Sequence, residues 1–169
     1  MRKKYRIRIY NGGDRVIRFE RTNKFGEYIY KESAPLSREE FYRILSGDCA
    51  FLLHSEHSLL QEFYVEYRSV CLRPRVIVDY ERVPLIADAG TVRVTFDSHV
   101  RAAVGSFDIF DKTLSSVPAM EPGELLMEVK YTEFLPRAIQ DLIGGEARER
   151  TAFSKYVLCF EATQYQRSL

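Results

Sequence analysis

Apolar and polar residues alternate at the start of the chain, which predicts a β-strand over residues 3–10. Side chains of a strand point alternately to its two faces, so Lys4, Arg6 and Arg8 share one face, and the tyrosine and isoleucines between them share the other. Like charges at this spacing repel each other. The pattern therefore indicates a phosphate-bearing ligand on the cationic face. A solvated edge strand is the alternative, because edge strands often carry cations.

Two turns divide the next residues into further strands. Asn11-Gly12-Gly13-Asp14 supplies residues that tolerate positive φ, as a tight hairpin requires, and alternation resumes over residues 15–20. A second turn at residues 24–27 leads into a strand over residues 28–31. This order predicts an antiparallel meander of three strands.

Helical patterns follow the meander. Ser37 and Glu40 have the spacing of a capping box, and Gly47 is placed to close the helix that they begin. Apolar residues at helical spacing predict a second amphipathic helix over residues 58–70, which ends before Pro74.

Strand patterns dominate the rest of the chain. We expect strands over residues 75–82, 91–97 and 124–131, a turn at residues 88–90, a loop over residues 112–123, and helices over residues 136–143 and 153–158. Antiparallel strands with a few helices between them indicate an α+β fold and not a doubly wound parallel sheet.

Composition narrows the classes of protein. The 169 residues, 46% hydrophobic and 29% charged, suit a single domain over residues 1–169. The net charge of +1 means that any anion site is local, and nucleic acid is not an expected partner. No apolar run reaches the roughly 18 residues of a membrane span. Three widely spaced cysteines argue against a disulfide framework, and with the lack of a membrane span they lead us to expect a cytoplasmic protein. His54 and His57 lack the further ligands of a zinc site.

Charged residues recur inside the later strands. The pairs that share a face are Tyr80 with Arg82, Arg93 with Asp97, and Glu128 with Lys130. If the apolar faces pack on the helices, the charged faces meet on the remaining side, and a curled sheet there would form a charged tunnel. Such a tunnel requires an ion-rich ligand or internal ion pairs.

Short strings of residues in this chain resemble the VTC domain, which is the polyphosphate polymerase domain of the vacuolar transporter chaperone family within the triphosphate tunnel metalloenzymes. The strings are Tyr5-Arg6-Ile7-Arg8, Phe19-Glu20 with Lys24 and Lys31-Glu32-Ser33, Tyr80-Glu81-Arg82, Arg93-Val94-Thr95-Phe96-Asp97, Glu128-Val129-Lys130-Tyr131 and Phe153-Ser154-Lys155-Tyr156. Each string alone is weak evidence for the family, but all of them occur in the family's order, which makes the resemblance specific. The resemblance implies an antiparallel β tunnel or barrel of the triphosphate tunnel metalloenzyme type with flanking helices.

The resemblance also implies a metal-dependent polyphosphate polymerase that transfers the γ-phosphate of ATP to a growing polyphosphate chain. The metal would be Mn²⁺ or Mg²⁺, bound by Glu128. The implied catalytic residues are Arg6, Arg8, Arg82, Arg93 and Lys155, and the implied phosphate- or nucleotide-binding residues are Lys24, Lys31, Tyr80, Lys130 and Ser154. Phosphoryl transfer depends more on positioning and charge neutralisation than on a covalent nucleophile, which suits these residue types.

The chain departs from the family in two places. Thr22 stands where the family usually has a lysine, which removes one cation. The family's section before the Tyr-Arg-Ile-Arg strand is missing, so we expect a tunnel that lacks one wall. The open sheet edge at residues 4–10 would favour association with another copy of the chain.

Two other functions use the same residues. A triphosphate hydrolase needs the same cations and metal, and a non-catalytic module would bind polyphosphate or another polyanion without chemistry. Glu128 with Lys130 could instead form a simple surface ion pair, and Ser154 and Lys155 could face solvent. Thr22 and the missing section favour the binding module, whereas Glu128 favours an enzyme.

Overall fold

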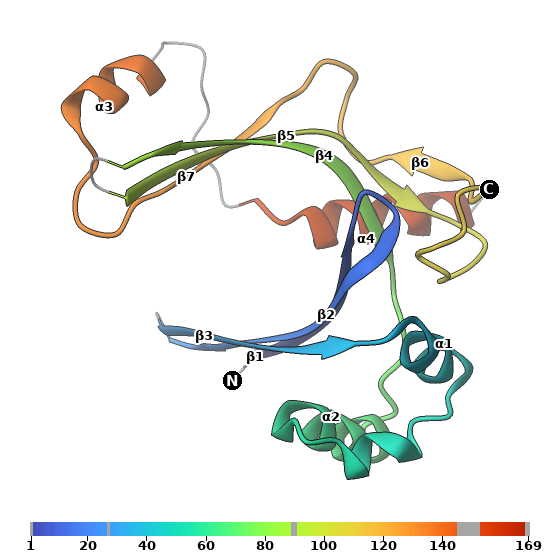
Figure 1. The fold of residues 1–169 in the computed structure, drawn as a ribbon. Helices are drawn as coiled ribbons and strands as arrows, with labels where there is room; N and C mark the ends of the chain where they lie inside the picture. Colours follow the sequence, from blue (N-terminus) through green and yellow to red (C-terminus); the bar gives the residue numbers. More distant parts are fainter. Residues whose placement is uncertain (1, 27, 89–90, 145–152, 168–169) are drawn as a thin grey trace. The chain divides into compact units, whose positions relative to one another are not determined.

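The computed structural model describes residues 2–26, 28–88, 91–144 and 153–167, and the chain divides into two compact units. Unit 1 comprises residues 1–75 and 106–114, and unit 2 comprises residues 76–105 and 115–169. Each unit contains its own antiparallel sheet (Figure 1). Compact units alone do not decide whether a chain folds as one domain, so the single domain over residues 1–169 stays a prediction.

Unit 1 begins with the predicted meander. Its strands are β1 (Arg2–Tyr10), β2 (Gly13–Phe25) and β3 (Tyr28–Leu36), paired in the order β1-β2-β3. Asn11 and Gly12 adopt φ angles of 53° and 64°, as the sequence of the first hairpin turn predicts. The second predicted turn contains Gly26 at φ 58°, while Glu27 lies outside the described residues.

The helices of unit 1 confirm the predicted start and end signals. They are α1 (Arg38–Ser46), the 3₁₀ helix η1 (Ala50–His54) and α2 (Ser58–Ser69). The Glu40 amide donates to Ser37 Oγ at 3.1 Å, and the Ser37 amide donates to Glu40 Oε2 at 2.7 Å, which completes the capping box. Gly47 ends α1 in the left-handed conformation at φ 90°.

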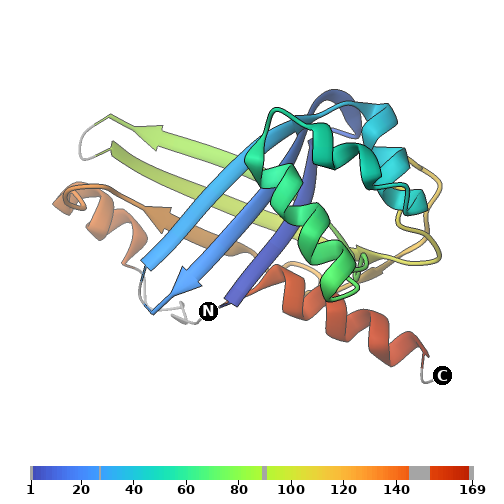
Figure 2. The same cartoon turned by 90° about the horizontal axis from the view of Figure 1, so that it is seen from below.

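The core of unit 1 lies between the sheet and these helices. Phe19, Leu52 and Leu60 are almost fully buried there, and Ile7 packs against the same cluster. The ring centroids of Phe19 and Phe63 lie 4.7 Å apart, which joins β2 to α2. Figure 2 shows α2 crossing this face of the three strands. The apolar side of the meander is therefore covered, and its opposite side is the one that carries the cations.

Unit 2 is organised around one long central strand. Its strands are β4 (Ile77–Ala87), β5 (Val92–Ala103), β6 (Ser116–Pro118) and β7 (Leu126–Lys130). β5 pairs with β4, β6 and β7. The short strand β6 lies inside the stretch for which the sequence predicted a loop. A segment of three residues with a proline is too short to show an alternation of apolar and polar residues. The strand is therefore identified only by its backbone pairing with β5.

The helices of unit 2 are α3 (Arg137–Ile143) and α4 (Lys155–Arg167), and α4 is longer than predicted. Val100, Ala102 and Cys159 are buried together between β5 and α4, and burial raises the pKa of the Cys159 thiol to about 11. The charged run at residues 146–150, whose sequence predicts a solvated start for the last helix, lies outside the described residues. None of the described helices combines the length and the apolar character that a membrane crossing needs.

The structure confirms an α+β fold with antiparallel sheets. The described strands pair into one sheet of three strands and one of four, and strand pairing among them closes no barrel. The tunnel that the resemblance implies therefore stays a prediction.

Candidate functional site

One face of the unit 1 sheet gathers basic side chains, and we call it the basic face. The strand register places Arg6 opposite Glu20 and Arg8 opposite Arg18 on this face. It places Thr22 opposite Lys31, and Lys24 follows two positions later on the same face. Within the stretch where β1 and β3 both pair with β2, the described polar members are Lys4, Arg6, Arg8, Arg18, Glu20, Thr22, Lys24, Lys31 and Ser33. Four sequence-predicted residues, Arg6, Arg8, Lys24 and Lys31, thus share one surface.

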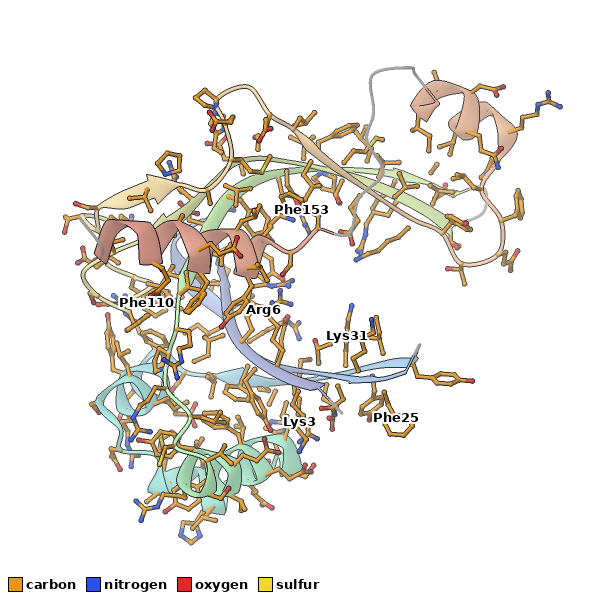
Figure 3. All side chains as sticks on the ribbon, turned by 180° about the vertical axis from the view of Figure 1, so that it is seen from behind. Lys3, Arg6, Phe25, Lys31, Phe110 and Phe153 are labelled. Carbon is orange, nitrogen blue, oxygen red and sulfur yellow. The ribbon has the colours of Figure 1, made fainter. Side chains whose placement is uncertain are left out.

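Figure 3 shows the two sides of this sheet. Arg6 and Lys31 project from the side opposite α2, whereas Lys3 points toward α2. Lys3 forms an ion pair with Glu66 of that helix. The alternation of the sequence therefore separates Lys3 from the basic face although it is adjacent to Lys4.

Glu20 is the one carboxylate among the described members of the basic face. Arg6 Nε donates to Glu20 Oε2 at 2.9 Å, and Arg8 Nη2 lies 3.5 Å from the same oxygen. One acid is therefore shared by two arginines. Arg18, Lys24 and Lys31 are exposed and have no ion-pair partner among the described residues. The face carries a large excess of positive charge, and anions would be drawn to it.

A second set of charged residues lies on one face of the unit 2 sheet. The register places Arg82 opposite Asp97, Thr95 opposite Glu128 and Arg93 opposite Lys130. The sequence-predicted Tyr80, Arg82, Arg93, Glu128 and Lys130 are thus brought to one face. Arg93 is exposed and has no ion-pair partner among the described residues.

Asp97 is the centre of the strongest ion-pair network in unit 2. Arg82 Nε lies 2.6 Å from Asp97 Oδ1, and Arg82 Nη2 lies 2.7 Å from Oδ2. Lys155 Nζ lies 2.5 Å from Oδ2. Both cations also lie over the Tyr80 ring, at 5.2 and 5.0 Å from its centroid. We call Tyr80, Arg82, Asp97 and Lys155 the Asp97 cluster.

The charges of the Asp97 cluster stabilise one another. Burial by itself would raise the pKa of the Asp97 carboxyl, but hydrogen bonds and charges from Arg82 and Lys155 outweigh burial and hold the pKa below its usual value. The hydrogen bond to Asp97 in turn raises the pKa of Arg82. The Asp97 carboxylate and the Arg82 guanidinium are therefore charged at neutral pH.

Glu128 lies beside this cluster and is more accessible. Its side chain keeps 41% of its surface exposed, and Lys130 Nζ lies 2.9 Å from Oε1. Arg82 Nη2 lies 4.0 Å from Oε2. Burial acts to raise the pKa of the Glu128 carboxyl. The hydrogen bond to Lys130 and the charges of Lys130, Arg82 and Lys155 together outweigh burial, so the pKa lies below its usual value.

The donor groups here fit a divalent cation only if phosphate completes its coordination. Glu128 offers one accessible carboxylate, and the hydroxyl of Thr95, on the neighbouring strand, is buried without a hydrogen-bond partner among the described residues. Both oxygens of Asp97 are occupied by cations. Across the described parts of the chain, no group of three or more His, Cys, Asp or Glu side chains could hold a metal. Mg²⁺ commonly binds one or two carboxylates plus substrate phosphates, which matches this arrangement.

The last helix supplies two of the predicted residues. Lys155 begins α4, and the Ser154 carbonyl accepts hydrogen bonds from the Val157 and Leu158 amides at 2.9 and 3.1 Å. Contrary to the expectation that helices cover only the apolar faces, α4 packs on the same face as Tyr80 and Arg82, farther along the strands. A bulge in the pairing beside Tyr80 and an unusual φ of 50° at His99 mark the change from charged to apolar residues.

Sequence reasoning left three residues of these faces without a role. Arg18 and Glu20 belong to the basic face, and Asp97 organises the cluster that carries its name. Alternation already placed Asp97 beside Arg93, but a charged residue in an alternating strand is usually solvent-facing. Its burial depends on contacts with Arg82 and Lys155, which are distant in sequence.

Comparison with protein families supplies the context for these residues. The family model described as the VTC domain matches residues 1–164 of the 169-residue chain. No curated protein matches the chain. The family match spans the basic face, the charged face of unit 2 and every sequence-predicted site residue. The chain therefore belongs to the VTC domain family.

Proposed function

We propose that this protein is a metal-dependent polyphosphate polymerase that extends a polyphosphate chain with the γ-phosphate of ATP. Family membership connects the chain to polyphosphate chemistry. The observation that carries the proposal is that Arg18, Lys24 and Lys31 of the basic face have no ion-pair partner among the described residues, while Glu20 is the one described carboxylate of that face. A polymer of closely spaced negative charges is the kind of ligand that such a row of cations suits.

The residues divide into two roles. Arg6, Arg8, Lys24 and Lys31 would bind phosphates of the polymer, and Arg82, Arg93, Lys130 and Lys155 would neutralise the charge of the phosphates that react. The terminal oxygen of the polymer would attack the γ-phosphorus of ATP in line, and the bond from that phosphorus to the β-phosphate oxygen would break, which releases ADP. Ser154 and Tyr80 would help to hold the nucleotide and its phosphates.

Glu128 would hold Mn²⁺ or Mg²⁺ together with phosphate oxygens. When bound, such an ion supplies charge neutralisation and alignment of the phosphates. The metal dependence that is general in the family supports this assignment. Incoming phosphates would also compete with Glu128 for Lys130 and Arg82, which would free the carboxylate for the ion.

The direct test incubates the purified chain with ATP and Mn²⁺. We expect ADP and long polyphosphate, detected by ³¹P NMR and by gel electrophoresis of the polymer. Phosphate release without polymer would instead indicate a triphosphate hydrolase, in which water replaces the polymer end. If a folded sample yields neither product with Mn²⁺ or Mg²⁺, the polymerase proposal is wrong for this chain.

Replacing Glu128 tests the role of the metal ligand. We expect Glu128→Gln to lower polymer synthesis by at least about a hundredfold, because an electrostatic stabiliser of phosphoryl transfer is lost. Binding of polyphosphate in the absence of metal should persist, since the variant removes a negative charge. Glu133→Gln is the matched control, because this acid is exposed and lies outside the charged face. Equal synthesis by the Glu128 and Glu133 variants would contradict the assignment.

A binding module is the second candidate. Both carboxylates of the unit 2 face are already within ion-pair distance of cations, and no described cluster forms a metal cage of protein groups. This candidate predicts salt-sensitive binding of polyphosphate that Arg6→Ala and Arg93→Ala weaken, with no turnover of ATP under any metal condition.

A further inference from the structure

Asp97 is a charged residue in a position where charge is costly. Its side chain has no exposed surface, although it lies on the charged face of β5. A buried carboxylate loses its hydration, and ion pairs must offset that loss. An apolar or neutral residue at this position would avoid the cost. The placement of an acid inside a site suited to anions therefore calls for an explanation.

The contacts of Asp97 fix two cations that come from different elements. Arg82 belongs to β4 and Lys155 begins α4, and both meet the same carboxylate. Arg82 uses Nε and Nη2 for Asp97 at 2.6 and 2.7 Å, which sets the plane of its guanidinium. Its Nη1 makes no hydrogen bond to any described residue and stays available to a ligand.

Tyr80 restricts the same two cations from another direction. Its ring lies 5.2 Å from the Arg82 guanidinium carbon and 5.0 Å from Lys155 Nζ. Both long side chains would otherwise sample many rotamers, and ordering them on binding would cost affinity. Held by Asp97 and Tyr80, they are ordered before a ligand arrives.

We infer that Asp97 is a positioning residue that presents Arg82 and Lys155 to phosphate groups, and that its negative charge therefore strengthens the binding of a polyanion. This inference rests on the proposed function, because it assumes that phosphates are the ligand of the face. It is distinct from that function, since a polyphosphate site can exist without such positioning.

Charge alone predicts the opposite result, which makes the inference testable. If Asp97 acts only as a nearby negative charge, Asp97→Asn should bind sodium polyphosphate more tightly than wild type. If Asp97 positions the cations, Asp97→Asn should bind about tenfold more weakly, the loss expected from one charge-assisted interaction. Affinity is measured by titration calorimetry without metal, and circular dichroism checks that each variant is folded. Equal or tighter binding by folded Asp97→Asn would overturn the inference.

A double-mutant cycle separates positioning from a general structural effect. Arg82→Ala should weaken binding in wild type but much less in the Asp97→Asn background, because Arg82 is no longer held there. Arg93→Ala should weaken binding equally in both backgrounds, since Arg93 has no ion-pair partner among the described residues. A structural role of Asp97 would instead change the Arg82 and Arg93 effects alike, and that result would contradict the inference.

A measurement on the wild-type protein covers the case in which Asp97→Asn does not fold. In ¹⁵N NMR spectra of the ligand-free protein, the Arg82 Nε–H should exchange with solvent at least about tenfold more slowly than the Arg93 Nε–H, because Asp97 accepts it. Equal exchange rates would show that Asp97 does not hold Arg82. This measurement needs no polyphosphate, so its outcome does not depend on the proposed function. Failure of wild type to bind polyphosphate would instead count against that function.

Discussion

Glu20 shows how one residue sets the balance of the basic face. It accepts from Arg6 and lies near Arg8, and its side chain keeps only 16% of its surface exposed. An acid at this place partly neutralises two cations and reduces their mutual repulsion. It also competes with phosphates for the same arginines. The residue therefore stabilises the empty sheet at the expense of anion affinity.

Removal of this acid gives a prediction. We expect Glu20→Gln to bind sodium polyphosphate several-fold more tightly at low salt, because the Glu20 carboxylate then no longer competes with phosphates for Arg6 and Arg8. Fluorescence titration with labelled polyphosphate would measure the change. Glu39→Gln, on α1, removes the same charge outside the face and should change affinity little. Weaker binding by Glu20→Gln would mean that Glu20 positions its arginines in the way inferred for Asp97.

The lowered pKa of Asp97 leads to a prediction of how the stability of the protein depends on pH. Its pKa is lower in the folded protein than the value of about 3.9 expected when unfolded. Its contribution to the free energy of unfolding is therefore complete above about pH 4 and is lost as pH falls through the folded pKa. Denaturant titrations between about pH 5 and pH 2 should show a steeper loss for wild type than for Asp97→Asn. Equal slopes would contradict the lowered pKa.

At the scale of elements, the residues at the two ends of α1 determine where this helix begins and stops. α1 has nine residues, which is short for a helix in water, and its capping box satisfies amides that the helix leaves unpaired. Tyr67 Oη would lie 3.2 Å from a Cβ at Gly47, so both space and the left-handed conformation favour glycine there. The cap residues therefore set where α1 begins and ends.

The capping box provides a test of this local contribution. Ser37→Ala should lower the free energy of unfolding by about 1 kcal/mol, because the Glu40 amide loses its acceptor. Urea denaturation followed by circular dichroism would measure it. Ser58→Ala, at the first residue of α2, removes a hydroxyl that bonds to no described residue and should change stability by less than about 0.5 kcal/mol. Similar losses for both variants would argue against the capping role.

At the scale of the whole molecule, the numbers of acidic and basic residues are nearly equal, but the two kinds of charge lie in different places. The net charge is +1, yet cations collect on the basic face while acids pair elsewhere, as Glu32 and Glu62 do with the buried Arg21. Burial opposes the charge of Arg21, but hydrogen bonds led by Glu62 keep its pKa raised. Segregation of this kind produces a local anion site without a basic protein.

Local patterns were enough to predict much of the fold. Alternation placed Lys4, Arg6 and Arg8 on one face, and turn and cap residues marked the meander and α1, because these signals depend on neighbours in sequence. The three-residue strand β6 and the full length of α4 were missed. Both depend on pairing or packing with β5, which no local pattern records. The VTC family was also predicted from the sequence and is confirmed.

Side-chain direction in a strand follows a period of two residues, so the order of residues alone specifies which side chains can share a face. It also determined the excess of cations over acids on the basic face. Which cations form ion pairs depends on the folded arrangement of strands and helices. Asp97 became the partner of Arg82 and Lys155 because strand register and the start of α4 bring three distant residues together. Ion pairing and burial depend on such long-range contacts, and a pattern along the chain does not specify them.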